Sequence, residues 1–337
     1  VSTLDGGVVA SESAEAKPGW AKYVLAVYEE LRPLAPESGA RLALDGDLPS
    51  TGGLSSSSAL SVGCTIALNE TWELGLDSAE LVATAVRAER TAAIAGGAMD
   101  QTVIAYARPG HALRIDFDPP AHRHIPMPES FVWVAGYSGT KAPKGESAAN
   151  SYNSFVLASW AAAALLGDAP EPDSSHTPQL SRVRSASPES VAALPKLSVE
   201  EAAAISSSSQ LNLPADQQLD LRVSAEHVLT EAARVDEAEE ALAAGDAEHM
   251  GRLMDASHHS LASYGASTAA LDRLVAAARA AVAAGARVTG AGFGGWAIAL
   301  TEGQHSGAVQ SAMEAACGGP TFVATPEGGA LWSLNAQ

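Results

Sequence analysis

The chain has few cysteines, few basic residues and no long uninterrupted apolar run. Cys64 and Cys317 are the two cysteines in 337 residues, which is too few for a disulfide framework and fits a reducing cytosol. The 20 basic residues face 39 acidic ones, and the net charge of −19 argues against nucleic acid or an anionic membrane as partner. No run of about 18 apolar residues and no basic segment before a short apolar one is present, so we expect a cytoplasmic protein without membrane span or signal peptide.

What is present is a globular composition, with 47% apolar residues and enough length for two domains. Apolar residues recur at helical spacing in six segments. These segments are residues 20–31, 59–68, 77–90, 150–166, 249–261 and a stretch from 222 onward. Alternating or continuous apolar patterns predict strands at 41–45, 111–117, 131–135 and 296–300, while 167–217 reads as short helices joined by loops.

The most informative stretch is the run of small residues from Leu48 to Leu60, which leads straight into the helical pattern. Glycines allow close approach of a ligand to the backbone, and the free N–H groups at a helix N-terminus attract anions. The sequence therefore indicates a phosphate-binding turn, although a Gly/Ser run before a helix is more often a flexible turn with a cap.

This stretch resembles the PxxxGLSSSA signature of the GHMP kinase superfamily, which includes galactokinase, mevalonate kinase and homoserine kinase. Further segments resemble galactokinase: Ala98-Met-Asp-Gln101, the HALRIDF segment 111–117, Gly251 with its neighbours in HMGRLMDASHHSL, and TGAGFGG at 289–295. The resemblance covers most of residues 18 to 335. It implies the two-domain α+β GHMP kinase fold, with an S5-like α/β domain at 1–136, a ferredoxin-like α+β domain at 137–337 and an active site in the cleft between them.

The resemblance also implies the site residues. For ATP it indicates the adenine neighbours and the phosphate loop of residues 49–58, namely Trp20, Tyr23, Thr51, Gly52, Gly53, Leu54, Ser55, Ser56, Ser57 and Ser58. Ser57 and Glu89 would bring Mg²⁺, and Asp100 would be the catalytic carboxylate. Gly97, Asp100, Tyr152 and Gly292 would contact the sugar. Each has a plainer alternative, because an aromatic helical stripe such as Trp20 and Tyr23 is usually core and an Asp such as Asp100 often caps a helix.

Two other hypotheses rest on single features. Gly290 to Gly295 has the spacing of a dinucleotide loop, which would suggest a NAD(P)-dependent oxidoreductase, but that fingerprint must open a helix and the sequence predicts a strand at Trp296. His258 and His259 suggest a metal site, but adjacent residues point to different helix faces. We expect His258 to be a hydrogen-bonded packing residue.

The chain also departs from the galactokinase pattern. Nothing in it resembles the GRxNLIGEHxDY segment that grips the sugar in that family, and Lys22 stands where the family has Asn. After Tyr152 and Asn153 the family continues with paired arginines, whereas this chain has Ser154-Phe155-Val156. We expect a truncated chain, with a rebuilt sugar pocket or a non-catalytic relative as alternatives. The resemblance thus predicts an ATP- and Mg²⁺-dependent galactokinase, monomeric or weakly dimeric. A kinase for N-acetylgalactosamine, arabinose, a uronic acid or an octose, and a sugar sensor without turnover, remain open.

Overall fold

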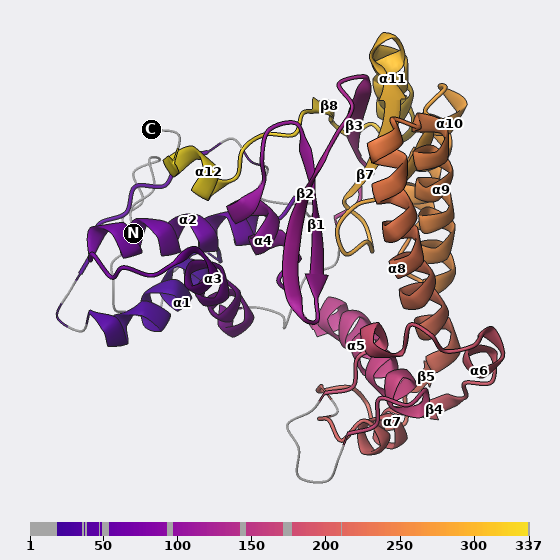
Figure 1. The fold of residues 1–337 in the computed structure, drawn as a ribbon, viewed down its shortest axis with the longest axis horizontal. Helices are drawn as coiled ribbons and strands as arrows, with labels where there is room; N and C mark the ends of the chain where they lie inside the picture. The colour runs from indigo at the N-terminus through magenta and orange to yellow at the C-terminus, as the bar shows by residue number, and fades with distance from the viewer. Residues whose placement is uncertain are drawn as a thin grey trace. The chain divides into compact units, whose positions relative to one another are not determined.

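The computed structural model describes residues 19–35, 37, 39–46, 48, 54–92, 97–141, 146–170, 177–209 and 211–335, without the side chains of residues 146–149 and 333–335. These residues form two units, shown with their element labels in Figure 1. The first holds the described residues up to Ile115, His122–Pro126 and those from Thr325 onward. The second holds Asp116–Ala121 and Met127–Ala324.

The first unit is mainly helical. Its elements are α1 Ala21–Leu31, η1 Arg32–Leu34, α2 Ser56–Thr71, α3 Ser78–Ala92, α4 Met99–Tyr106, most of the two-stranded sheet of β1 His111–Phe117 and β2 Pro120–Pro126, and α12 Ala330–Asn335. The predicted helices at 20–31, 59–68 and 77–90 and the strand at 111–117 are confirmed.

The core of the first unit lies between α1, α2 and α3. Val24, Val27 and Leu31 of α1 are spaced three and four residues apart, so they share one face and are buried against Cys64 of α2 and Ala88 of α3. Burial in this core raises the pKa of the Cys64 thiol to about 11, so this cysteine is a packing residue and stays protonated at neutral pH.

The start of α3 carries the reciprocal cap that its sequence predicts. The Asp77 carboxylate accepts hydrogen bonds from the backbone N–H groups of Ala79 and Glu80 at 2.8 and 2.9 Å. In return the Glu80 carboxylate accepts one from the Asp77 N–H at 2.8 Å. This capping box satisfies three of the free donors at the helix start.

The strand predicted at residues 41–45 is wrong. Residues 39–46 have no regular secondary structure, and no described segment pairs with them. The alternation of Leu42 and Leu44 reflects packing of both side chains on the α1–α2–α3 core. Burial on one face alone does not make a strand, because its backbone needs a neighbouring strand to bond to.

The second unit combines a sheet with several helices. Its elements are β3 Phe131–Tyr137, α5 Glu146–Leu165, η2 Leu180–Val183, α6 Pro188–Ala192, β4 Lys196–Ser198, α7 Val199–Ile205, β5 Gln218–Asp220, α8 Leu221–Ala244, α9 Ala247–Tyr264, α10 Ala269–Ala280, β6 Gly285–Val288, β7 Trp296–Glu302, η3 Gly303–His305, α11 Ser306–Cys317 and β8 Thr321–Ala324. The remaining predicted helices and strands are confirmed. The short β4–β5 pair within 167–220 adds to the short helices expected there.

The sheet of the second unit has the order β6-β7-β3-β8, with antiparallel neighbours throughout. Its register places Ala286, Ala299 and Val134 side by side on one face. Because alternate strand residues share a face, these side chains meet the buried faces of α10 and α11, including Leu274 and Met313. The result is an α+β layer with helices packed on the sheet, as the fold class predicts.

The helices α8 and α9 lie side by side as a long hairpin, which Figure 1 shows in orange. Helix α9 also touches β6 so closely that neither side has room for a side chain. A Cβ on Gly251 would lie 2.0 Å from the Ala284 carbonyl oxygen, and one on Gly285 would lie 2.1 Å from the Gly251 oxygen. The Gly251 of the galactokinase-like segment is therefore explained by packing.

Candidate functional site

The first candidate site lies at the start of α2 in the first unit. Thr51, Gly52 and Gly53 lie outside the described residues, and Leu54 is half-buried just before the helix. Ser55 adopts a left-handed conformation with φ of 53°, and its carbonyl accepts from the Ala59 N–H at 2.9 Å. No described side chain caps this helix. The first N–H groups, those of Ser56 and its neighbours, therefore remain available for an anion.

Side chains from four helices converge beside this helix start, and we call them the polar cluster: Tyr23 of α1, Ser57 and Ser58 of α2, Glu89 of α3 and Gln101 of α4. The Gln101 amide nitrogen donates to the Glu89 carboxylate at 2.5 Å and approaches the Ser58 hydroxyl at 3.4 Å. Tyr23 and Ser57 share a side-chain hydrogen bond. The structure thus brings together four residues that the sequence assigned separately to ATP and metal.

The polar cluster is partly shielded from water. Burial raises the pKa of Tyr23, the negative charge of Glu89 raises it further, and the hydrogen bond with Ser57 opposes both. The Lys22 ammonium lies 5.0 Å from the centre of the Tyr23 ring. A carboxylate, two serine hydroxyls and a neutral phenol therefore meet in a place where a cation and polyphosphate oxygens would be recognised.

Asp100 lies in the first turn of α4, next to Gln101. The N-cap of this helix is Ala98, so Asp100 is inside the helix and is not its capping residue. The side chain is half-buried, and within the described part of the chain its carboxylate has no hydrogen-bond or ion-pair partner. Gly97 is exposed just before the helix, with nothing within 4 Å of the position of a Cβ.

Trp20 lies at the N-cap of α1. Its ring is half-buried and packs against the α1–α2–α3 core. Of the two aromatic residues expected near the nucleotide, Tyr23 therefore joins the polar cluster, while Trp20 contacts the core.

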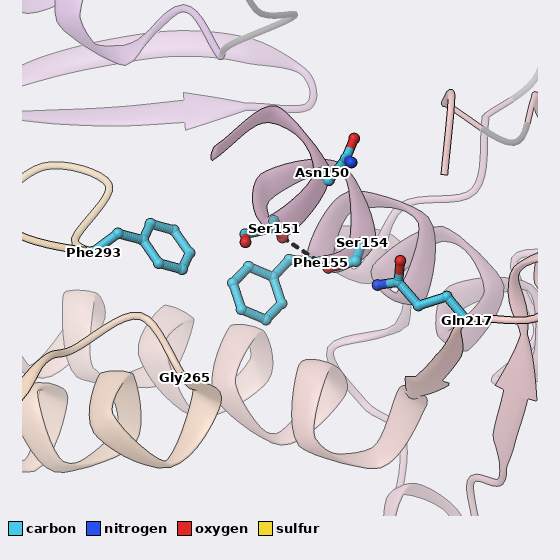
Figure 2. A pocket seen from close by; sticks show the side chains of 7 residues that line it. All are labelled: Asn150, Ser151, Ser154, Phe155, Gln217, Gly265 and Phe293. Atoms are coloured by element: carbon cyan, nitrogen blue, oxygen red, sulfur yellow. Dashed lines mark hydrogen bonds between the residues drawn. The ribbon is translucent and has the colours of Figure 1, made fainter. Parts of the chain in front are cut away.

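In the second unit, a pocket of about 570 Å³ lies between the first turns of α5 and the loop after β6. Figure 2 shows its lining, which consists of Asn150, Ser151, Ser154, Phe155, Gln217, Gly265 and Phe293. Ser151 and Ser154 flank Tyr152, and Phe293 follows Gly292. The structure thereby places the neighbours of two predicted sugar-binding residues, 140 positions apart in sequence, around one pocket.

Two phenylalanines of the lining belong to a stack of rings. Phe155 stacks on Tyr264 with ring centres 4.0 Å apart and lies parallel to Phe293 at 5.9 Å, and Tyr264 stacks in turn on His227 at 4.3 Å. Burial raises the pKa of Tyr264 well above its ordinary value and lowers that of His227. The other lining side chains are amides and hydroxyls, so the lining carries no ionisable group.

The glycine loop between β6 and β7 is a hairpin connection. Trp296 opens β7, which pairs antiparallel with β6, so the strand predicted after the glycines is confirmed and a helix-opening dinucleotide loop is wrong. Gly292 has φ of +82°, and a Cβ there would lie 2.1 Å from the Ala266 carbonyl oxygen. The Phe293 N–H donates to the same oxygen at 2.7 Å, which fixes the loop on the turn after α9.

The described side chains alone do not form a metal site. Among the described residues, no three His, Cys, Asp or Glu side chains are grouped so as to hold an ion. His258 is mostly buried and its Nε2 lies 3.4 Å from the Asp272 carboxylate, as suits a packing residue. Any cation at the polar cluster would need further oxygen ligands from a substrate or water.

Sequence reasoning misses Gln101 as a site residue. A glutamine after a candidate aspartate gives no sign of the helices it will face, and only the packing of α4 against α2 and α3 reveals it. Sequence reasoning also misses Phe155 as a pocket residue, because the sequence shows it only at a point where the chain departs from the paired arginines of galactokinases. Its partners Tyr264 and Phe293 are more than 100 residues away.

Comparison with known proteins agrees with this architecture. The model of the GHMP kinases N terminal domain matches residues 22–108, and that of the GHMP kinases C terminal domain matches residues 238–319. A crystal structure of Lactococcus lactis galactokinase complexed with galactose is similar with a TM-score of 0.71 and 25% identity, over 96% of this chain and 80% of that one. The two family models and the fold define a kinase of the GHMP class.

Several curated relatives of this chain are galactokinases. A galactokinase of Chloroflexus aurantiacus is 35% identical over 87% of this chain and 69% of its own length. A galactokinase of Streptomyces coelicolor is 32% identical over 92% of this chain and 75% of its own. The chain belongs to the galactokinase family, and is an ATP-dependent sugar kinase. None of its described helices is long and apolar enough to cross a membrane.

Proposed function

We propose that this chain transfers the γ-phosphoryl group of ATP to the anomeric hydroxyl of galactose, giving galactose 1-phosphate and ADP. The observation that carries the proposal is the polar cluster at the start of α2, in a chain whose relatives are galactokinases. Phosphoryl transfer needs positioned phosphates, charge neutralisation and a group that handles the proton of the attacking hydroxyl. The first unit offers a candidate for each.

The phosphates of ATP would be held by Thr51, Gly52 and Gly53, which lie outside the described residues, and by the α2 start, Leu54 to Ser58. The uncapped N–H groups of this helix support the assignment. Tyr23 and Trp20 are the proposed neighbours of the adenine. Tyr23 would at the same time orient the Ser57 hydroxyl through their shared hydrogen bond.

Ser57 and Glu89 are the proposed protein ligands of Mg²⁺. The donor set fits, because Mg²⁺ prefers oxygen ligands and usually takes only one or two carboxylates, completing its shell with phosphates and water. A buried Gln101 oxygen beside Glu89 has no partner among the described residues, which also suits a hydrated cation as neighbour. When bound, the ion would neutralise charge on the transferring phosphoryl group.

Asp100 is the proposed catalytic carboxylate. As the sugar oxygen attacks the γ-phosphorus, its O–H proton passes to the carboxylate and the bond from phosphorus to the bridging oxygen breaks, releasing ADP. The absence of a hydrogen-bond or ion-pair partner among the described residues leaves the carboxylate available for this role. Gly97 is proposed to contact the sugar from the same helix start.

The second unit carries its own proposed sugar contacts, Tyr152 and Gly292. Both lie beside this pocket, whose two phenylalanine rings, amide groups and hydroxyls suit a neutral sugar. The boundary at residue 136 between the two kinase domains remains our proposal. So do a monomeric or weakly dimeric state and a cytoplasmic location, the latter supported by the free cysteines Cys64 and Cys317.

The test is coupled detection of ADP release with Mg·ATP and a panel of free sugars: galactose, N-acetylgalactosamine, arabinose and galacturonic acid. We expect galactose to give the highest kcat/KM. A higher value for another sugar would move the proposal to that substrate. Binding of ATP and sugar without any ADP release would instead indicate a sensor.

A further inference from the structure

Gln101 is an almost fully enclosed polar side chain of the first candidate site. Only 4% of its surface is exposed, and it extends from α4 to both α2 and α3. Its amide nitrogen lies 2.5 Å from one Glu89 carboxylate oxygen and 3.4 Å from the Ser58 hydroxyl. Gln101 therefore ties the proposed metal carboxylate to α2, the helix whose start is the proposed phosphate site.

The orientation of the Gln101 amide follows from its partners. An ionised carboxylate only accepts hydrogen bonds, so the nitrogen must face Glu89 and the oxygen must face away. That oxygen, Oε1, is buried and has no hydrogen-bond partner among the described residues. A buried acceptor without a donor is costly, which points to a donor that arrives with a ligand.

Of the groups that ATP and Mg²⁺ would bring to the site, only some can donate a hydrogen bond to Gln101 Oε1. Ionised phosphate oxygens at neutral pH can only accept, so the polyphosphate does not supply it. No described donor, the Tyr23 hydroxyl included, lies within hydrogen-bond distance of Oε1. A water on a divalent cation is a strong donor, and Mg²⁺ keeps several waters when it binds through one carboxylate.

We propose that Gln101 is the positioning residue of the metal site. Its Nε2 holds the Glu89 carboxylate in one orientation, and its Oε1 accepts a hydrogen bond from a water of the cation's shell. The inference rests on the proposed function, since it needs Mg²⁺ at Ser57 and Glu89. Partners of this kind orient metal ligands, and their loss typically lowers metal affinity by about 10- to 100-fold.

The test measures Mn²⁺ binding by electron paramagnetic resonance on the full chain in the presence of ADP. Gln101→Met keeps the length of the side chain but has no N–H donor and only a weak acceptor, and Gln101→Asn keeps the amide but shortens its reach. We expect both to lose Mn²⁺ affinity by about 10- to 100-fold. The concentration of Mg²⁺ that gives half-maximal rate should rise, while affinity for metal-free ADP stays within about twofold.

Thr102→Val is the matched control. Thr102 is the next residue of α4, is 9% exposed, and donates its hydroxyl to the Ala98 carbonyl of its own helix at 2.7 Å. It should alter stability without altering Mn²⁺ affinity. If Gln101 had only a structural role, Gln101→Met and Gln101→Asn would likewise lower the melting temperature and leave Mn²⁺ affinity unchanged.

Three outcomes decide the matter. Unchanged Mn²⁺ affinity in either folded Gln101 variant overturns the inference and leaves the kinase proposal intact. Absence of Mn²⁺ binding in the wild type overturns the metal site itself. Normal Mn²⁺ binding without sugar phosphorylation contradicts only the proposed function.

Discussion

Asp100 separates a kinase from a protein that only binds its ligands. Asp100→Asn keeps the size and polarity of the side chain but removes the charge that we propose accepts the proton of the attacking hydroxyl. Turnover per folded molecule should fall by about 10²- to 10⁴-fold, with ATP affinity little changed because the α2 start is untouched. The measurement is steady-state ADP release together with calorimetric ATP binding.

Asp77→Ala is the control for that experiment. Asp77 caps α3 with two backbone hydrogen bonds, so its loss should lower the free energy of unfolding by about 1 kcal/mol and leave turnover intact. If Asp100→Asn behaves like this cap variant, Asp100 has no part in the chemistry.

Ser57→Ala tests the proposed metal hydroxyl. The change removes the hydroxyl that also bonds to Tyr23, while the backbone N–H groups of α2 remain. We expect a rise in the Mg²⁺ concentration needed for half-maximal rate. Ser61→Ala, one turn along the same helix, serves as control because the buried Ser61 hydroxyl has no partner among the described residues. Identical Mg²⁺ dependence in the two variants would count against Ser57.

Gly292 should matter for folding as well as for any ligand. Gly292→Ala would place a methyl group 2.1 Å from the Ala266 carbonyl oxygen at a φ of +82°. Strain of this kind costs on the order of 1–3 kcal/mol, so the melting temperature should fall. Gly307→Ala in α11 is the matched control, since nothing lies within 4 Å of its Cβ position and alanine favours a helix. A stable Gly292→Ala protein would show that the loop can shift.

The α8–α9 hairpin is fastened to β6 by a charged network. The Glu231 carboxylate accepts hydrogen bonds from Arg287 at 2.9 Å, Ser257 at 2.5 Å and Arg234 at 2.7 Å. Burial alone would raise the pKa of Glu231, but Arg287, Ser257 and Arg234 outweigh it and leave the pKa below its ordinary value. The ionised form is therefore stabilised by folding.

This network predicts a pH-dependent loss of stability. A carboxyl whose pKa is lowered by folding stabilises fully above its unfolded pKa, and that stabilisation disappears as the pH falls through the folded one. Glu231→Gln should therefore lower the free energy of unfolding at pH 7 by about 1–3 kcal/mol. The difference from wild type should shrink below the ordinary glutamate range near pH 4.

Urea unfolding at pH 7 and at pH 3 would measure this effect. Glu248→Gln is the control, because Glu248 pairs with Arg252 at 87% exposure and should change stability little at either pH. A Glu231→Gln deficit that stays constant with pH would assign the effect to packing.

Local patterns predict most elements but not the contacts between them. Helical periodicity is enough for α1, α3 and α9, and the Asp77 and Glu80 pair predicts its own capping box. The same logic fails for residues 41–45, where Leu42 and Leu44 alternate for packing without a partner strand. Alternation reports which side chains are buried and not which backbone is paired.

The candidate site shows the same limit. Ser57, Glu89 and Asp100 could be proposed as site residues from the sequence because each lies in or near a segment that resembles a galactokinase motif. Gln101 becomes visible only when α2, α3 and α4 are packed, since its two bonds span 12 and 43 residues. Long-range hydrogen bonds leave no periodic signal in sequence.

For the molecule as a whole, the net charge of −19 opposes a polyphosphate ligand. Phosphate binding must therefore work through local donors, and the uncapped α2 start offers them beside Ser57 and Glu89, the proposed cation ligands. The two family matches, to residues 22–108 and 238–319, add a second domain of the same kinase class. Both observations favour a sugar kinase over a binding module.

The most direct test is phosphorus magnetic resonance of the full chain mixed with galactose and Mg·ATP. We expect a new phosphomonoester signal on galactose, growth of ADP in equal amount, and loss of the sugar's reducing end because the phosphate lies on the anomeric oxygen. Inorganic phosphate without a sugar ester, or unchanged ATP despite measurable binding of both ligands, would contradict it.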